Sequence, residues 1–404
     1  NDPNGLNKYA DFCGPFPSHN MLQVVCVCFI LLIFNSAKAL DDPESFMTPI
    51  EIIRYWGYPA ENYDVITKDG YILALQRIPH GRNSEANSSC TRPAVLLVHG
   101  QGTDGTQYIM NPPESSPAFI LADAGFDVFL LNQRGTTYSK RHVTLKPHFG
   151  SKFWQYSVDE MSKYDATATI DKVLKITGQK AVYWIGHSQG TLVGFMTLSG
   201  QPKYNSKFYR FAIGSHEVLS LWPSTYRPLA HLCNSIPWLA QEICFENFEL
   251  LFGPPAKTFN WDKSVNQYLQ TRLPVYLSHF PAGTSTQSVL HLAQIVTHAK
   301  VEYMDHNPLE NMQRYGQLTP PPYNYSNMDV PVYLYWSRDD WLTNPEGIQH
   351  YIVPNIRKHL LKGGLEVPGY NHLDFSLATD CAEKVWLPIA NVMRSMESGE
   401  TCGR

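Results

Sequence analysis

Short hydrophobic runs alternate with longer amphipathic stretches through the first half of the chain. Tyr63–Ile66 and Tyr71–Arg77 are rich in residues that favour strands, and the Asp-Gly turn between them predicts a hairpin. Pro93–Val98 is a short apolar run between turn residues, which is typical of a buried parallel strand, and Phe126–Leu131 predicts the next strand.

Two stretches among these strands have helical character. Ser116–Ala124 predicts a helix, and Asp159–Lys175 carries apolar residues at helical spacing and ends near Gly178. Strands and helices that alternate at this rhythm predict an α/β fold with a mostly parallel, doubly wound sheet.

The most informative stretch is Ala181–Gly190, which reads AVYWIGHSQG. A β-favouring run leads directly into Gly186-His187-Ser188-Gln189-Gly190, and the helix-compatible run Thr191–Leu198 follows at once. A glycine two residues to either side of Ser188 permits a chain reversal so sharp that a Cβ would collide there, and such a strand-turn-helix exposes the serine at its apex as a nucleophile. We therefore expect Ser188 to be the nucleophile and Gly186 and Gly190 to form its elbow.

The alternation breaks between residues 214 and 327, where prolines, aromatic residues and short helical runs such as Leu232–Phe252 and Thr286–Ala299 dominate. This stretch predicts an insertion over the carboxyl edge of the sheet, in the form of a mainly helical cap or lid. Strand patterns resume at Val330–Trp336 and again near Gly364–Val367, so the sheet is interrupted once and then completed.

The N-terminal region has the pattern of a targeting segment. The first methionine is Met21, an apolar run extends from Leu22 to Phe34, and small residues stand at 37 and 39. We expect a signal peptide rather than a buried core helix, and a mature chain that starts near Leu40. The expected division is 1–20 upstream of the native product, 21–39 signal peptide, 40–213 first part of the core, 214–327 cap and 328–404 second part of the core.

Composition narrows the possible partners. The chain has 404 residues, of which 43% are hydrophobic, 13% aromatic and 17% charged, and its net charge is −4. Disorder is therefore not expected, and no basic face suggests nucleic acid as a partner. The sequence predicts no cofactor, no metal site and no membrane span in the mature chain, and it gives no indication of the oligomeric state.

Cysteines and sequons agree with a secreted or endomembrane route. Beyond the signal peptide the cysteines number five, so at least one thiol is free or pairs elsewhere: Cys90, Cys233, Cys244, Cys381 and Cys402. The loop-like sequons at Asn87 and Asn324 are candidate glycosylation sites.

A serine nucleophile needs a general base and a group that orients the base. In this strand-turn-helix architecture the acid and then the histidine follow the serine, each on a loop after a strand. The loop after the strand at Trp336 offers Asp339 or Asp340, and the segment after the last strand offers His372. His350 and His359 are weaker alternatives because they lie in helical surroundings.

Acyl transfer also needs backbone donors for the oxyanion. One is the N–H of Gln189, directly after the nucleophile, and the second is expected on the loop after an early strand. His99-Gly100-Gln101 occupies that loop, and Gly100 lets the backbone approach closely, so the N–H of Gln101 is the second candidate.

With these residues in view, the chain resembles the acid lipase family, the gastric and lysosomal lipases and their relatives in plants and invertebrates. The resemblance extends from about residue 46 to 395 and rests on several motifs, namely Tyr55–Glu61, Thr67–Pro79, Asn132–Arg141, Phe153–Gln179, Gly186–Gly190, Ser278–Ser285, Asp340-Trp341-Leu342 and Tyr370–Phe375.

The resemblance implies an α/β-hydrolase core with a helical cap, and hydrolysis of lipid carboxylic esters, triacylglycerols or cholesteryl esters, at a lipid–water interface. It favours Asp340 over Asp339, because the family's acid directly precedes a pair matched by Trp341-Leu342, and it places the histidine at His372. It implies a secreted or lysosomal protein. A small-ester esterase, a serine peptidase or thioesterase, and a catalytically silent lipid-binding protein are the alternatives on this fold.

Three positions depart from the family pattern. Gln101 stands where the family usually has leucine, which leaves the backbone donor in place but makes the pocket lining more polar. The loop before Asp340 is one residue shorter than in mammalian members. Cys244 lacks its usual partner, since Gly253 stands there, which leaves a bridge to Cys233 as an alternative.

Overall fold

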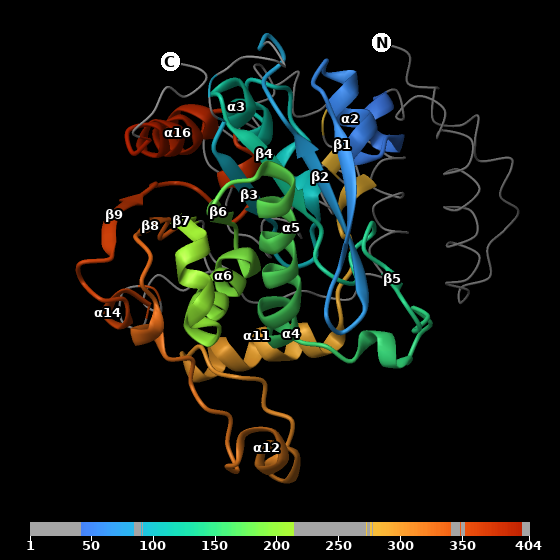
Figure 1. The fold of residues 1–404 in the computed structure, drawn as a ribbon, viewed down its shortest axis with the longest axis vertical. Helices are drawn as coiled ribbons and strands as arrows, with labels where there is room; N and C mark the ends of the chain where they lie inside the picture. The colour runs from blue at the N-terminus through green and yellow to red at the C-terminus, as the bar shows by residue number, and fades with distance from the viewer. Residues whose placement is uncertain are drawn as a thin grey trace, which may run out of the picture.

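The computed structural model of the 404-residue chain describes residues 42–84, 90, 92–213, 272, 275–276, 278–340, 348 and 352–397. A twisted sheet lies at the centre of these residues, with helices on both of its faces (Figure 1). The signal-peptide prediction, the helix expected over Leu232–Phe252 and most of the expected cap lie outside the described residues.

The sheet has the strand order β1-β2-β4-β3-β6-β7-β8-β9, with β5 pairing to β2. The pairs β1–β2 and β2–β4 are antiparallel, and every pair from β4 to β9 is parallel, which confirms a mostly parallel sheet. The strands are β1 (Glu61–Ile66), β2 (Tyr71–Ile78), β3 (Ala94–Val98), β4 (Asp127–Leu131), β5 (Arg141–His142), β6 (Val182–Gly186), β7 (Phe208–Ile213), β8 (Val332–Trp336) and β9 (Leu361–Glu366).

Helices connect and cover the strands. The α-helices are α2 (Pro49–Tyr55), α3 (Pro117–Asp123), α4 (Val158–Glu160), α5 (Thr167–Thr177), α6 (Gln189–Gly200), α11 (Thr286–His298), α12 (Pro308–Tyr315), α14 (Val353–Asn355), α15 (Asp374–Leu377) and α16 (Leu387–Arg394). Shorter 3₁₀ turns cover Pro43–Phe46, Gly105–Tyr108, Lys152–Trp154, Pro202–Lys207 and Tyr325–Asn327, and π-helical turns cover Met161–Ala166 and Ala382–Trp386.

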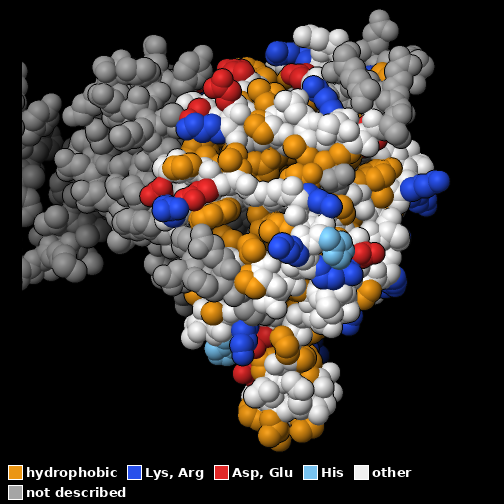
Figure 2. All heavy atoms as spheres, turned by 90° about the vertical axis from the view of Figure 1, so that its left-hand side faces the viewer, with side chains coloured by type: hydrophobic (Ala, Val, Ile, Leu, Met, Phe, Trp, Pro, Cys, Tyr) orange, Lys and Arg blue, Asp and Glu red, His pale blue; other side chains and the backbone are white. Residues whose placement is uncertain are grey.

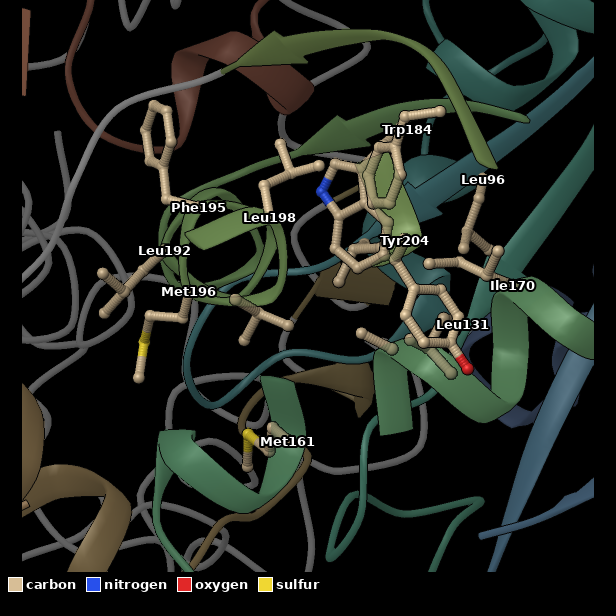
Figure 3. Packing of buried hydrophobic residues seen from close by; sticks show 14 of the residues in the cluster. Leu96, Leu131, Met161, Ile170, Trp184, Leu192, Phe195, Met196, Leu198 and Tyr204 are labelled. Carbon is tan, nitrogen blue, oxygen red and sulfur yellow. The ribbon is translucent and has the colours of Figure 1, made fainter. Parts of the chain in front are cut away.

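Each face of the sheet has its own hydrophobic core, because successive side chains of a strand point to opposite faces. In β6, Tyr183 and Ile185 belong to the core beneath α3 and α16, whereas Val182 and Trp184 belong to the core beneath α5 and α6. Figure 3 shows the second core, where side chains from β3, β4, β6, α5 and α6 converge around Trp184. Both faces are buried, which explains why the central strands are apolar throughout.

Most elements expected from the pattern are present. The hairpin forms β1 and β2, the apolar runs form β3, β4, β6 and β8, and the expected helices form α3, α6 and α11. The helix expected over Asp159–Lys175 is interrupted by the π-helical turn and ends at Thr177, where Gly178 takes a left-handed conformation. The pattern did not indicate β7, which is the sixth strand across the sheet.

Between β7 and β8 the described residues include α11 and α12, and α12 lies on a projection at the bottom of Figure 1. The projection is fixed at its base, where the buried Asp159 carboxylate accepts hydrogen bonds from the Tyr323 hydroxyl (2.7 Å) and the Met304 N–H (2.9 Å). Figure 2 shows patches of hydrophobic side chains on the projection, mainly at its lower end; Leu309 is 79% exposed and Leu318 is 57% exposed. Among the helices of the described ranges, not one combines the length and hydrophobicity needed to cross a bilayer.

Candidate active site

Ser188 lies at the apex of a strained turn between β6 and α6. Its backbone has φ 54° and ψ −124°, a conformation that residues other than glycine rarely adopt. A Cβ on Gly186 would lie 2.4 Å from the Gly190 carbonyl, and one on Gly190 would lie 2.1 Å from the Val98 oxygen. Glycine is therefore required at both positions for β6, α6 and β3 to pack this closely, and the turn raises Ser188 above the sheet edge.

His372 and Asp340 form a buried pair. The His372 Nδ1–H donates to Asp340 Oδ2 at 2.9 Å, and Asp340 Oδ1 lies 3.2 Å away. His372 is 4% exposed and Asp340 is 1% exposed. Because Nδ1 is the donor, the imidazole nitrogen Nε2 is left without a proton in the neutral ring and can act as a base. The chain order Ser188, Asp340, His372 is the order expected for this architecture.

His187 connects the elbow to the histidine loop. Its Nε2–H donates to the backbone carbonyl of His372 at 2.8 Å, and the two imidazole rings lie 4.8 Å apart. Burial, and then the proximity of His372, lower the pKa of His187 to about 3, so its ring is neutral. The bond brings the loop of His372 next to the residue before Ser188. The Ser188 hydroxyl itself has no hydrogen-bond partner within the described residues.

The loop after β3 is held by a second neutral imidazole. His99 Nδ1–H donates to the Gly100 carbonyl at 2.8 Å, and its Nε2 accepts the Gln133 N–H at 3.0 Å. Burial lowers the pKa of His99 to about 4, which keeps Nε2 available as an acceptor. A Cβ on Gly100 would lie 2.9 Å from Ser188 Cβ and 3.4 Å from its Oγ, so this loop packs directly against the serine.

A single buried amide joins the loop after β3 to the loop of His372. The Gln107 Oε1 accepts the Gly100 N–H at 3.1 Å, and its Nε2 donates to the Ser376 hydroxyl at 2.9 Å. The His372 loop is further shaped by Asn371, whose Oδ1 accepts the Leu373 N–H at 2.9 Å. Hydrogen bonds therefore fix both loops that flank the serine.

Two backbone N–H groups at this site have no acceptor. Across the part of the chain that the structure describes, neither the N–H of Gln101 nor that of Gln189 donates a hydrogen bond. Gln189 is the first residue of α6, where the helix leaves its first N–H groups unpaired and its dipole favours negative charge. Both donors lie beside Ser188, so they are available to an oxyanion.

The other sequence-predicted residues are placed as follows. Asp339 does not contact His372; its Oδ2 accepts the Gly369 N–H at 2.7 Å. His359 is exposed in the turn before β9 and not in a helix as expected. Asn324 is exposed, and its Oδ1 caps the 3₁₀ turn by accepting the Ser326 N–H at 3.0 Å. The remaining predicted positions lie outside the described residues: Trp341, Leu342, His350, Asn87, Cys233, Cys244, Gly253 and Cys402.

Two cysteines of the described residues differ in state. Cys90 is disulfide-bonded, whereas Cys381 is a free buried thiol, in agreement with the prediction of at least one unpaired cysteine. Within the residues that the structure describes, we find no cluster of three or more potential metal ligands (His, Cys, Asp or Glu) that could hold a metal ion.

Sequence reasoning missed the supporting roles of His187, His99, Gln107 and Gln133. Two of them stand in recognisable motifs, since His187 lies inside the elbow and His99 precedes Gly100. Neither motif indicates which group the histidine binds by hydrogen bond. Gln107 and Ser376 are 269 residues apart, so their contact depends on the assembled sheet.

Comparisons with known proteins identify the family of this chain. Residues 49–112 match the family model of a partial alpha/beta-hydrolase lipase region, and residues 93–375 match that of the alpha/beta hydrolase fold. The lipase lipl-3 of Caenorhabditis elegans is 36% identical, over 94% of this chain and 100% of that protein. Gastric triacylglycerol lipase of Bos taurus is 37% identical, over 92% of this chain and 98% of that protein. Lipase member K of Homo sapiens is 36% identical, over 92% of this chain and 98% of that protein. The chain therefore belongs to the acid lipase family of the α/β-hydrolases.

Proposed function

We propose that this protein hydrolyses carboxylic esters of lipids, with Ser188 as nucleophile, His372 as general acid and base, and Asp340 orienting the histidine. The observation that carries the proposal is the conjunction of the strained Ser188 turn with the buried His372–Asp340 pair and two unpaired N–H groups. Relatives whose names describe them as triacylglycerol lipases and lipases support the lipid ester as substrate.

In the first half of the reaction, His372 Nε2 takes the hydroxyl proton as Ser188 Oγ attacks the ester carbonyl carbon. The carbonyl oxygen gains negative charge, which the N–H groups of Gln101 and Gln189 stabilise. Asp340 stabilises the imidazolium that forms and fixes its tautomer. The bond from the carbonyl carbon to the alcohol oxygen then breaks, and His372 gives its proton to the departing alcohol.

In the second half, a water molecule attacks the acyl group bound to Ser188, and His372 accepts a proton from it. The bond to Oγ breaks, His372 returns the proton to the serine, and the fatty acid leaves. Both halves require His372 in its neutral form before attack, so activity depends on that form being populated at the working pH.

Rates on triolein, cholesteryl oleate and p-nitrophenyl butyrate from pH 4 to 8 test this function. Hydrolysis of at least one long-chain ester and labelling of Ser188 by a fluorophosphonate probe are expected. A purified, folded protein that hydrolyses none of the three esters and takes up no probe would contradict the proposal.

We further propose that the protein acts at a lipid–water interface. Long-chain esters are nearly insoluble, and the projection that carries α12 presents exposed apolar side chains such as Leu309 and Leu318. Activity on triolein should therefore rise sharply when droplets form. Saturation on monomeric p-nitrophenyl butyrate with no such rise would instead indicate a small-ester esterase.

A secreted or lysosomal location is also a proposal. The apolar segment Leu22–Phe34 followed by small residues supports a signal peptide. The disulfide at Cys90 supports an oxidising compartment, since disulfides are rare in the reducing cytosol. Recovery of the protein from culture medium or lysosomes, shortened at its N-terminus, tests this location.

A further inference from the structure

Unpartnered buried polar atoms concentrate around Ser188. Within the described residues, both amide atoms of the Gln101 side chain lack a hydrogen-bond partner, although Gln101 is only 8% exposed. The Gln189 Oε1 and the Ser188 Oγ are also unpartnered. Buried polar groups are paired in more than about nine cases in ten, so a buried carboxamide with both ends unpaired calls for an explanation.

Each of the other four buried glutamines among the described residues pairs at least one end of its amide; Gln133 donates to the His99 carbonyl and Gln189 to Met161 Sδ, although the Oε1 of each is unpartnered. Gln107 bonds through both ends, to Gly100 and to Ser376, and the Gln76 amide donates to Asn62 and accepts from Asn132. Gln101 therefore differs from these glutamines in being paired at neither end. A side chain that is buried and unpaired is suited to a ligand that supplies the missing hydrogen bonds.

The position of Gln101 relates it to the reacting bond. It directly follows Gly100, where an added Cβ would lie 3.4 Å from the Ser188 Oγ, and its own N–H is a proposed oxyanion donor. The side chain of Gln101 therefore starts next to the place where the ester carbonyl must bind. Since a glutamine side chain is only a few bonds long, it can reach groups close to that carbonyl.

The chemistry of lipid esters limits what that group can be. A fatty acyl chain has only CH₂ groups beside the ester carbonyl, so a polar group near the reacting bond must come from the alcohol. A carboxamide has an NH₂ group that donates and a carbonyl oxygen that accepts, and a hydroxyl can both accept from the first and donate to the second. Glycerol esterified at one or two positions carries free hydroxyls next to the ester, whereas a sterol ester or a triacylglycerol carries none.

We propose that Gln101 is a specificity-determining residue whose side-chain amide binds a free hydroxyl of the alcohol, so that partially esterified glycerol is the preferred substrate class. This proposal rests on the proposed ester hydrolysis at Ser188. A substrate that lacks the hydroxyl leaves the amide buried and unpaired in the transition state, and a site built this way discriminates strongly against it.

The test compares kcat/KM for 1-monooleoylglycerol and propyl oleate, which share the acyl chain and the three-carbon alcohol and differ only in the hydroxyls. The wild type should prefer the glycerol ester by about 10-fold to 100-fold. Gln101→Met, of similar length but apolar, should bring the ratio to within about threefold of one. The matched control Gln155→Met, at an exposed position outside the projection that carries α12, should keep the wild-type ratio.

Each outcome has a distinct meaning when fluorophosphonate labelling and thermal unfolding are measured alongside. If both esters are hydrolysed and Gln101→Met leaves the ratio unchanged, the Gln101 proposal is wrong and the proposed function stands. If neither ester is hydrolysed and Ser188 takes up no probe, both proposals fail. A stronger preference for propyl 3-hydroxyoctadecanoate, lost in Gln101→Met, would place the hydroxyl on the acyl side and overturn the assignment to the alcohol.

Discussion

Two buried polar regions of this protein, one around Arg134 and one around Ser188, are built in opposite ways. Around Arg134, every charged atom has a partner: the guanidinium donates to both Asp165 (2.8 Å) and Asp69 (2.6 Å) and stacks 3.9 Å from the centre of the Tyr71 ring. Around Ser188, the described residues leave several donors and acceptors unpaired.

The contrast separates a structural network from a binding site. The Arg134 network joins the β1–β2 hairpin to the π-helical turn, and its complete pairing offsets the cost of burying the charge. The unpaired atoms near Ser188 destabilise the fold, because each buried polar group without a partner costs about 1–3 kcal/mol. Their concentration at one strained turn is what a preorganised reaction site requires.

The largest expected effect comes from removing the Ser188 hydroxyl, which should affect catalysis and not stability. Ser188→Ala should lower kcat by about 10⁶, because the nucleophile is lost. Its thermal unfolding midpoint should equal or exceed that of the wild type, because the hydroxyl has no hydrogen bond to lose among the described residues. A variant that retains more than about a tenth of the wild-type rate would show that the nucleophile lies elsewhere.

The next effect concerns the two adjacent aspartates. Asp340→Asn should lower kcat by about 10⁴, because the imidazole of His372 loses control of its tautomer. Asp339→Asn is the matched control and should lower kcat by less than about tenfold, since the Asp339 carboxylate accepts the Gly369 N–H and forms no bond to His372 within the described ranges. The reverse order of effects, measured on purified variants with one ester, would contradict the geometry of this loop.

On the structural side, Arg134→Met should reduce the free energy of unfolding by about 3–5 kcal/mol, because Asp165 is left buried without its partner. The kcat of the folded fraction should stay within about threefold, since Arg134 makes no contact with the reacting groups. Arg141→Met is the control: its pair with Asp64 is about half exposed, so the loss should be below about 1 kcal/mol. Equal losses of unfolding free energy in the two variants, measured by urea unfolding, would show that the buried Arg134 network stabilises the fold no more than the exposed Arg141–Asp64 pair.

The smallest expected effect is the loss of folding stability in acid, caused by the buried histidines near Ser188. The folded-state pKa of His99 is lowered to about 4, so between the unfolded-state pKa of about 6.5 and pH 4 only the unfolded chain takes up the proton. Stability should therefore fall as the pH drops through this window, by about 3 kcal/mol from this one group, and level off below it. His187, with a pKa lowered to about 3, adds to the loss in the same direction.

His99→Asn tests the origin of this slope, because asparagine can form hydrogen bonds but does not titrate. The variant should be less stable than the wild type at pH 7 and lose less stability between pH 7 and pH 4. An identical slope in the two proteins, measured by urea unfolding at several pH values, would show that other groups control the acid response.

The local pattern predicted much of the scaffold. Strands β3, β4 and β6 were evident because both of their faces are buried, and the elbow was evident because two glycines flank a serine between a strand and a helix. The strand β7 was not predicted, since Phe208–Ile213 includes an arginine and directly follows a 3₁₀ turn. The resemblance to the acid lipase family is confirmed, whereas the catalytic roles of Ser188, Asp340 and His372 stay predictions.

By itself, then, the sequence determined the alternation of elements and the residues able to carry the chemistry, because burial patterns and turn sterics act over a few neighbouring residues. Only the tertiary structure decided which of these residues meet. It paired His372 with Asp340 and not with Asp339, and it placed Gln107 between two loops that are far apart in the chain. Among the described residues, it also left the Gln101 side-chain amide without a partner. Hydrogen-bond partners and desolvation depend on which segments the folded sheet brings together, and no local pattern encodes that assembly.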